Sequence, residues 1–215
     1  MNINILAGGP SELLPSLESY QTDTDIWVGV DKGVFTLLTK GINPAIAFGD
    51  FDSVTREEMT IIEEKVDALN QFKPEKDETD MELAMDWAIE QNPALIRIFG
   101  ATGGRIDHFI ANIQLLSKPL VSKNFEQVEI IDQKNIVYLR MPGKYLINKN
   151  SHFKYISFLP ITMEVSGITL EGFKYPLKNQ FLPLGSTLCI SNELINDYGH
   201  FSFSKGILMV VRSND

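Results

Sequence analysis

The chain has 215 residues, of which 44% are hydrophobic and 22% are charged, and its formal net charge is −9. These proportions are typical of a folded globular protein and exclude a chain that is disordered throughout. The acidic excess argues against binding to a nucleic acid, because contacts with phosphates need clustered Lys and Arg. No apolar run is long enough to cross a membrane and the first residues lack the pattern of a secretion signal. We therefore expect a cytoplasmic protein that does not bind membranes.

The first 120 residues alternate apolar runs with helical patterns. The strand candidates are residues 3–6, 26–30, 46–48 and 96–99. The helix candidates begin near residue 33 and cover residues 81–89 and 106–117, where apolar residues recur at helical spacing. Thr79 and Glu82 have the spacing of a capping box at the start of the second helix. This alternation predicts an α/β domain with a mainly parallel sheet.

An aspartate, Asp31, follows the second strand candidate directly. If the second and third strands are neighbours, Asp31 lies near Asp50 and Asp52, which follow the third. Adjacent carboxylates repel one another, and a bound divalent cation is the usual compensation. The alternative is that Asp31 caps the helix that begins near residue 33.

Two further carboxylates, Asp50 and Asp52, flank Phe51 after the third strand candidate. In an extended segment side chains alternate, so residues two positions apart project to the same side and can offer oxygens to one cation. The carboxyl end of a strand is also where open α/β sheets usually bind ligands. A solvated turn is the alternative, because Gly and Asp favour turns on their own.

The segment before the second helix combines Lys76 and Asp77 with Asp80. An acidic residue in the first turn of a helix is favoured by the helix dipole alone, which is the structural explanation for Asp80. A cation that suits phosphate and oxygens that suit a metal nevertheless occur together here. This combination favours chemistry on a phosphate group.

A glycine-containing loop joins the fourth strand candidate to the third helix, and it includes Gly103 and Gly104. Glycines in this position let backbone N–H groups approach an anion at the helix N-terminus. Arg105 and His108 share one helix face, which a solvated polar surface would also explain. The neighbouring loop and Asp107 favour a ligand-binding role for this face.

After residue 125 the pattern changes to short β-like runs separated by turn-forming residues. These runs are residues 128–131, 136–139, 155–159 and 207–211. They fit an antiparallel sandwich or barrel better than further βαβ units. We therefore expect two domains, at residues 1–125 and 126–215.

Several common site motifs are absent from the chain. It has no P-loop, no His/Cys spacing for zinc and no nucleophile elbow. Oxygen ligands and phosphate chemistry remain.

In order and combination, several segments resemble the bacterial thiamine pyrophosphokinases. These segments are Asp31–Gly33, Gly49–Ser53, Asp77–Asp80, Gly103–His108 with Asn112, Pro142–Lys144, Val165–Gly167, Gly185–Ser186 and Ser191–Glu193. The resemblance extends over nearly the whole chain. One departure is Lys32, because some members of the family have Gly there.

The resemblance implies an α/β nucleotide-binding catalytic domain, a β-sandwich domain that binds thiamine, and a homodimer with active sites at the subunit interface. It also implies transfer of pyrophosphate from ATP to the hydroxyl of thiamine, with Mg²⁺, giving thiamine pyrophosphate and AMP. The residues implied in catalysis and metal binding are Asp50, Asp52 and Asp80, without a distinction between general base and ligand. Those implied on the nucleotide side are Asp31, Lys76, Asp77, Thr102, Gly103, Gly104, Arg105, Asp107 and His108. For the loop through Arg105, Asp107 and His108, the resemblance allows a position facing either the nucleotide or thiamine. Ser191 and Asn192 are implied as thiamine contacts.

Two other functions fit parts of the pattern. A haloacid-dehalogenase-like phosphatase also has an Asp-x-Asp motif after an apolar run, and Asp50 would then be its nucleophile. That motif normally sits on the first strand, whereas two strand candidates precede Asp50. A sensor that binds ATP and metal without turnover is the second alternative, against which the complete acidic set argues.

Overall fold

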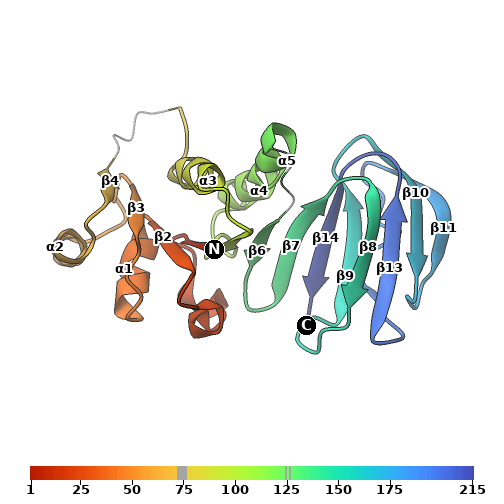
Figure 1. Cartoon of the computed structure of the whole chain (residues 1–215), viewed down its shortest axis with the longest axis horizontal. Helices are drawn as coiled ribbons and strands as arrows, with labels where there is room; N and C mark the ends of the chain where they lie inside the picture. The colour runs from red at the N-terminus through yellow and green to blue at the C-terminus, as the bar shows by residue number, and fades with distance from the viewer. Residues whose placement is uncertain (72–76, 124, 126) are drawn as a thin grey trace. The chain divides into compact units, whose positions relative to one another are not determined.

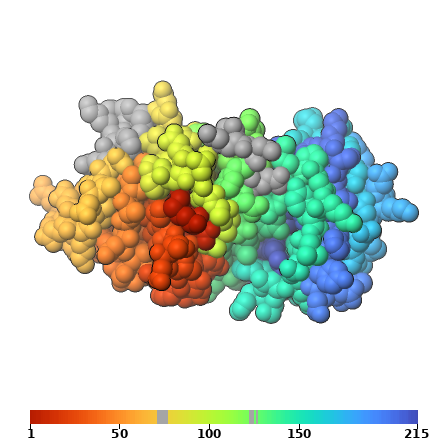
Figure 2. Space-filling view, viewed as in Figure 1, coloured from red at the N-terminus to blue at the C-terminus, as the bar shows by residue number. Residues whose placement is uncertain are grey.

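A computed structural model describes residues 1–71, 77–123, 125 and 127–215, and the remaining residues are drawn in grey in Figures 1 and 2. The chain divides into two compact units. The first consists of Met1–Ser122 with Gln127–Gln133, and the second is built mainly from Lys134–Asp215. In the described part of the chain, no helix combines the length and the apolar character needed to span a membrane. The cytoplasmic location stays a prediction.

The first unit contains a parallel sheet, as the alternating sequence pattern predicted. Its strands are β1 (Asn2–Leu6), β2 (Ile26–Val30), β3 (Ile46–Gly49), β4 (Leu69–Gln71), β5 (Leu95–Phe99) and β6 (Val128–Ile131). They lie in the order β6-β5-β1-β2-β3-β4, and every neighbouring pair is parallel. The carboxyl ends of all six strands therefore meet at one edge of the sheet, where ligands bind in open α/β folds.

Helices cover both faces of this sheet (Figure 1). They are α1 (Lys32–Thr39), α2 (Arg56–Lys65), α3 (Asp80–Glu90), α4 (Ile106–Leu115) and α5 (Ser117–Lys123), with short 3-10 turns at Ser11–Leu13 and Leu17–Tyr20. Ala47 of β3 packs with side chains of α1 and α2. Phe48, the next residue, points to the other face, where its ring lies 6.3 Å from that of Trp87 on α3.

Helix α2 begins with a complete capping box, in which Thr55 and Glu58 each bond the other's backbone N–H. At the start of α3, Thr79 accepts the backbone N–H of Glu82. The Glu82 carboxylate, which a full box would bring back to the cap, bonds Lys118 of α5 at 2.8 Å. The predicted cap at Thr79 is thus confirmed, and Glu82 connects α3 to α5.

The second unit is an antiparallel β sandwich, as predicted. Its strands are β7 (Asn135–Arg140), β8 (Gly143–Asn148), β9 (Tyr155–Pro160), β10 (Glu164–Glu171), β11 (Leu177–Pro183), β12 (Asn192–Glu193), β13 (Tyr198–Phe203) and β14 (Leu208–Ser213). Within the unit they form the series β12-β9-β14-β7 and β11-β10-β13-β8. Buried residues of both series, such as Phe158 and Phe201 with ring centroids 5.0 Å apart, share one core.

Candidate active site

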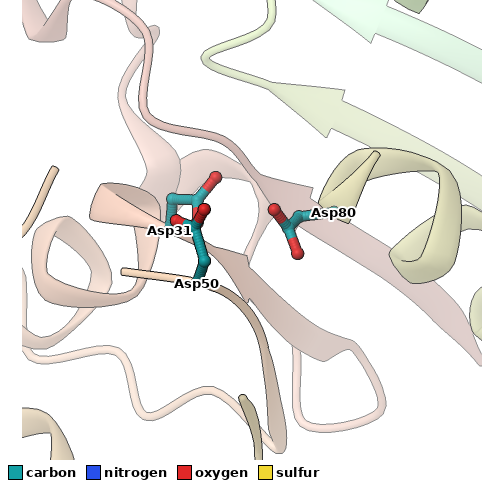
Figure 3. Close-up of side chains that lie close together, drawn as sticks. All are labelled: Asp31, Asp50 and Asp80. Atoms are coloured by element: carbon teal, nitrogen blue, oxygen red, sulfur yellow. The ribbon is translucent and has the colours of Figure 1, made fainter. Parts of the chain in front are cut away.

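Three carboxylates converge at the carboxyl edge of the parallel sheet (Figure 3). Asp31 follows β2, Asp50 follows β3, and Asp80 is the first residue of α3. One oxygen from each lies within 4.8 Å of the others. Because β2 and β3 are parallel neighbours with Val30 opposite Phe48, the backbone brings the first two together, as the sequence predicted. We call Asp31, Asp50 and Asp80 the acidic trio.

Asp31 is held in an unusual environment. Its backbone has φ 49°, which is rare outside glycine, and its side chain forms no capping bond with α1. Asp31 thus occupies the N-cap position of α1, but its carboxyl does not cap the helix. Its buried Oδ1 has no hydrogen-bond partner among the described residues. Burial, followed by the charges of Asp80 and Asp50, raises the pKa of Asp31 to about 6.

Gly49 makes room for the Asp31 carboxyl. A Cβ at this position would overlap Oδ1 of Asp31. The strand can therefore pass beneath the carboxyl only because residue 49 has no side chain. Gly49 was part of the sequence motif, but the steric reason why this residue is glycine becomes visible only in the structure.

Asp50 and Asp52 do not project together as the extended-strand argument predicted. Phe51 between them is buried and has φ 58°, so the chain turns here. The backbone N–H of Asp52 bonds Oδ1 of Asp50 at 3.0 Å. Asp50 thus forms the turn and also belongs to the acidic trio, whereas the exposed side chain of Asp52 lies outside it.

Asp80 enters the trio because Thr79 fixes the start of α3. The helix-dipole explanation and the ligand explanation are compatible here, because the first helical residue also faces the sheet edge. Two residues of α3, Glu82 and Asp86, bond Lys118 at 2.8 and 2.7 Å. Asp77 is exposed shortly before this helix, and Lys76 lies outside the described residues.

The glycine loop, residues 100–105, lies at the same edge after β5. Gly100 and Gly103 have φ 65° and 77°, which a side chain would disfavour. The carbonyl of Gly100 accepts the backbone N–H of Gly9, so the loops after β1 and β5 are in contact. Asn112 of α4 bonds the Ala101 carbonyl at 3.2 Å and ties the loop to the helix that follows.

Thr102 of this loop points inward. Its hydroxyl donates to Oδ2 of Asp132 at 2.8 Å, and both side chains are buried. Sequence reasoning missed Asp132. The signal was available, because Asp132 follows an apolar run in the same way as Asp31 and Asp50.

Arg105 and Asp107 are exposed and paired with each other. Arg105 donates through Nε and Nη2 at 3.1 and 2.6 Å, and this bonding lowers the pKa of Asp107 to about 2. The His108 backbone N–H also bonds Asp107. Exposed pairs of this kind contribute little to stability, so Arg105 can exchange its partner for a phosphate at small cost.

The predicted thiamine residues lie in the second unit. Ser191 is exposed and has φ 57°. Asn192 is buried, and its amide accepts the Tyr175 N–H and donates to the Tyr175 carbonyl. Asn192 therefore holds the loop around Tyr175, and its amide atoms are occupied by the backbone.

Comparisons with known proteins agree over the whole chain. Residues 17–130 match the family model "Thiamin pyrophosphokinase, catalytic domain", and residues 144–208 match "Thiamin pyrophosphokinase, vitamin B1 binding domain". A thiamine pyrophosphokinase of Bacillus subtilis is 52% identical over 99% of both chains. The chain belongs to the thiamine pyrophosphokinase family.

Solved thiamine pyrophosphokinases share this fold. The crystal structure from Bacillus subtilis has a TM-score of 0.95 and covers 100% of both chains. The crystal structure from Geobacillus thermodenitrificans is 48% identical in sequence and has a TM-score of 0.92. The match covers 100% of this chain and 98% of the Geobacillus chain. The chain is therefore an enzyme, a thiamine pyrophosphokinase, which is also called a thiamine diphosphokinase. The phosphatase and sensor alternatives are not supported.

The two family matches divide the site residues between them. The catalytic-domain match contains the acidic trio and the glycine loop, and the vitamin B1 match contains Ser191 and Asn192. Asp132 lies between the two matched ranges.

Proposed function

We propose that this thiamine pyrophosphokinase transfers the pyrophosphoryl group of ATP to the hydroxyl of thiamine, giving thiamine pyrophosphate and AMP, with Mg²⁺ at the acidic trio. The observation that carries the proposal is the convergence of the trio beside a glycine loop at the carboxyl edge of the sheet. Anionic phosphates meet a metal and backbone N–H groups at such an edge.

The donor set of the acidic trio suits Mg²⁺. Carboxylate oxygens are the ligands this hard cation prefers, and it commonly takes one or two carboxylates together with water and phosphate oxygens. The Asp31 Oδ1 that lacks a partner among the described residues offers one such atom. When bound, Mg²⁺ would neutralise negative charge on the transferred phosphates.

The glycine loop and its neighbours are the proposed nucleotide side. Backbone N–H groups near Gly103 and Gly104 would bind phosphate oxygens at the start of α4, with Arg105 donating from the same turn. His108 is exposed one turn further along the helix. We assign Asp77 and Lys76 to this side from the family resemblance, and Lys32 has no assigned role.

We assign to Asp52 the acceptance of the proton from the thiamine hydroxyl. Asp50 and Asp80 belong to the trio, and a carboxylate engaged with a cation is the weaker base. Asp52 is exposed two residues away, outside the trio. Its position next to Asp50 would hold it near the attacking hydroxyl.

On the thiamine side, Ser191 is the proposed direct contact and Asn192 the residue that positions the neighbouring backbone. Thiamine is a cationic aromatic molecule, for which an acidic chain is a suitable host. We expect Asn192→Ala to weaken thiamine binding more than ATP binding, because the Tyr175 loop would lose two hydrogen bonds. Titration of both ligands would contradict the assignment if ATP binding suffered more.

We also propose that the enzyme is a homodimer with active sites at the subunit interface. Helix α4 supports the association, because it has no fully buried residue and the apolar side chains of its first half are exposed in the single chain. Ile106 is 74% exposed and Ile110 51% exposed. A helix that presents apolar side chains to solvent commonly packs against a partner.

The direct test is incubation with ATP, Mg²⁺ and thiamine, followed by separation of nucleotides and thiamine esters. Equal amounts of AMP and thiamine pyrophosphate are expected. Release of ADP or free phosphate would point to another reaction. Omission of thiamine should abolish AMP formation, because water is not the intended acceptor.

Asp50→Asn and Asp52→Asn form a matched pair of variants. We expect both to reduce turnover at least about a hundredfold, as loss of a catalytic group commonly does. Only Asp50→Asn should also lose the rise in melting temperature on addition of Mg²⁺. A loss of this metal response in Asp52→Asn would place that residue among the ligands.

A further inference from the structure

The glycine loop is supported from beneath by residues that immediately follow β6. Strands β5 and β6 are parallel neighbours with Phe99 opposite Ile131, so Gly100 and Asp132 leave the sheet side by side. Asp132 then accepts the Thr102 hydroxyl at 2.8 Å, from the middle of the loop.

Both members of this bond are withdrawn from water. Thr102 is 9% exposed and Asp132 6% exposed. An ionised carboxylate can only accept hydrogen bonds, so it requires the hydroxyl of Thr102 to be the donor. A buried carboxylate is costly unless it is bonded, and this favours the loop conformation that turns Thr102 inward.

The next residue supports the loop from a second direction. The backbone N–H of Gln133 bonds the Leu13 carbonyl at 2.8 Å. The Leu13 side chain lies directly against Gly103, where a Cβ would overlap it. Asp132 therefore bonds the loop at Thr102, and Gln133 bonds the backbone of the residue whose side chain packs against Gly103.

We propose that Asp132 is a positioning residue for the nucleotide, acting through Thr102 to hold the glycine loop in its anion-binding shape. This inference rests on the proposed function of the loop, because it takes phosphate as the group that the loop N–H groups bind. The carboxylate of Asp132 would repel a phosphate bound at the loop, so electrostatic attraction does not explain why an acid stands here. Its presence is explained by the loop geometry that the bond to Thr102 maintains.

Four variants test the inference. Thr102→Val and Asp132→Leu remove the bond while filling similar space, whereas Thr102→Ser and Asp132→Asn keep a donor and an acceptor. We expect the KM for ATP to rise about tenfold in the first two, the size of one lost hydrogen bond to a charged group. The KM for thiamine should change little, and the conservative variants should recover most of the ATP affinity.

The double variant separates positioning from direct contact. If Thr102 acts only through Asp132, combining Thr102→Val with Asp132→Leu should raise the KM for ATP little more than either alone. If the double variant instead raised the KM for ATP by the product of the two single factors, Thr102 would contact the nucleotide independently of Asp132. That result would overturn the proposal.

Thr162→Val is a matched control in the second unit. The Thr162 hydroxyl is hydrogen-bonded as well, because it donates to the Glu164 carbonyl and accepts the Ile207 N–H. Its loss should lower the melting temperature by a few degrees, as in Thr102→Val, but leave the KM for ATP unchanged. An equal rise in KM in this control would show that general destabilisation explains the result.

Amide hydrogen exchange measures the loop without any substrate. Exchange at residues 103–105 should accelerate in Thr102→Val and Asp132→Leu and stay unchanged in Thr162→Val. Unchanged exchange and an unchanged KM in the first two would overturn the inference. If the wild type proved inactive with ATP and thiamine, the proposed function would fail, whereas the exchange result would still decide whether Asp132 holds the loop.

Discussion

Asp31 combines several features that reduce stability. Its backbone lies in a region that non-glycine residues seldom occupy, and its carboxyl is half-buried beside two other acids. Strain and perturbed titration of this kind cluster at functional sites. At the scale of one residue, the environment of Asp31 therefore lowers the free energy of unfolding of the protein.

Replacing this charge should stabilise the metal-free protein. The pKa of Asp31 is about 6 in the folded chain, above its ordinary value of 3.8. The folded state thus binds this proton more tightly than the unfolded state, and the residue's contribution to stability falls as pH rises from about 4 through 6. At pH 7.5 in EDTA, we expect the free energy of unfolding of Asp31→Asn to exceed that of the wild type by about 1–2 kcal/mol, after allowance for solvent screening.

Thermal unfolding at two pH values checks this. The gain of Asp31→Asn over the wild type should be present at pH 7.5 and small near pH 4, where the wild-type carboxyl is already protonated. Mg²⁺ should raise the melting temperature of the wild type only. A gain independent of pH would show that the charge is not its cause.

Gly49→Ala tests the steric condition beneath Asp31. The added Cβ would displace the Asp31 carboxyl, so we expect turnover to fall at least about tenfold and the Mg²⁺ response to weaken. Gly41→Ala is the control, because Gly41 has φ 73° and no atom within 4 Å of the added Cβ. It should cost about 1 kcal/mol through backbone strain yet keep the Mg²⁺ response.

At the scale of elements, the position of α3 decides where Asp80 lies. Lys118 of α5 bonds two acids of α3, and this network is only partly exposed. It connects two helices that are neighbours in space but separated in the chain. The geometry of the trio therefore depends on a contact outside it.

Lys118→Met removes this connection while keeping an apolar stem of similar length. We expect unfolding to require about 1 kcal/mol less free energy, and the Mg²⁺ concentration for half-maximal activity to rise a few-fold as α3 loosens. Lys205→Met, which breaks the ion pair with Glu164 in the sandwich, should affect stability alone. Equal metal dependence in both variants would contradict the role of Lys118.

Much of the element order could be predicted from apolar runs and their spacing. Strands β1, β2, β3 and β5 lie where the runs predicted them, but β4 is only three residues long and gave no periodic signal. Helix α2 was missed although its capping box, Thr55 and Glu58, stands in the sequence. The run at residues 128–131 was grouped with the β-rich half, whereas it pairs in parallel with β5. Short apolar runs do not reveal which sheet they join.

The site was predictable as far as strand ends determine it. Asp31 and Asp50 follow neighbouring parallel strands, so their proximity follows from topology. The positive φ of Phe51 was not predictable, and because of this turn the Asp52 side chain lies outside the trio. The inward turn of Thr102 was equally hidden, because its partner Asp132 is 30 residues away.

At the scale of the whole molecule, association is the main expectation. Ile110→Asp on the exposed side of α4 should shift the protein from dimer towards monomer, because a desolvated charge opposes apolar packing. Sedimentation velocity over a range of protein concentrations measures the shift. Met163→Asp, at another exposed apolar position, should leave the dimer intact. An unchanged dimer in Ile110→Asp would exclude this face of α4 from the interface.

The exposed α4 has a consequence for how activity responds to dilution. A helix of 10 residues without buried side chains is marginal by itself, and its first turn adjoins the glycine loop. If a second copy supplies the missing packing, mass action links the order of that turn to protein concentration. Turnover per chain should then fall when the enzyme is diluted below the concentration at which dimers separate, and saturating ATP should partly restore it.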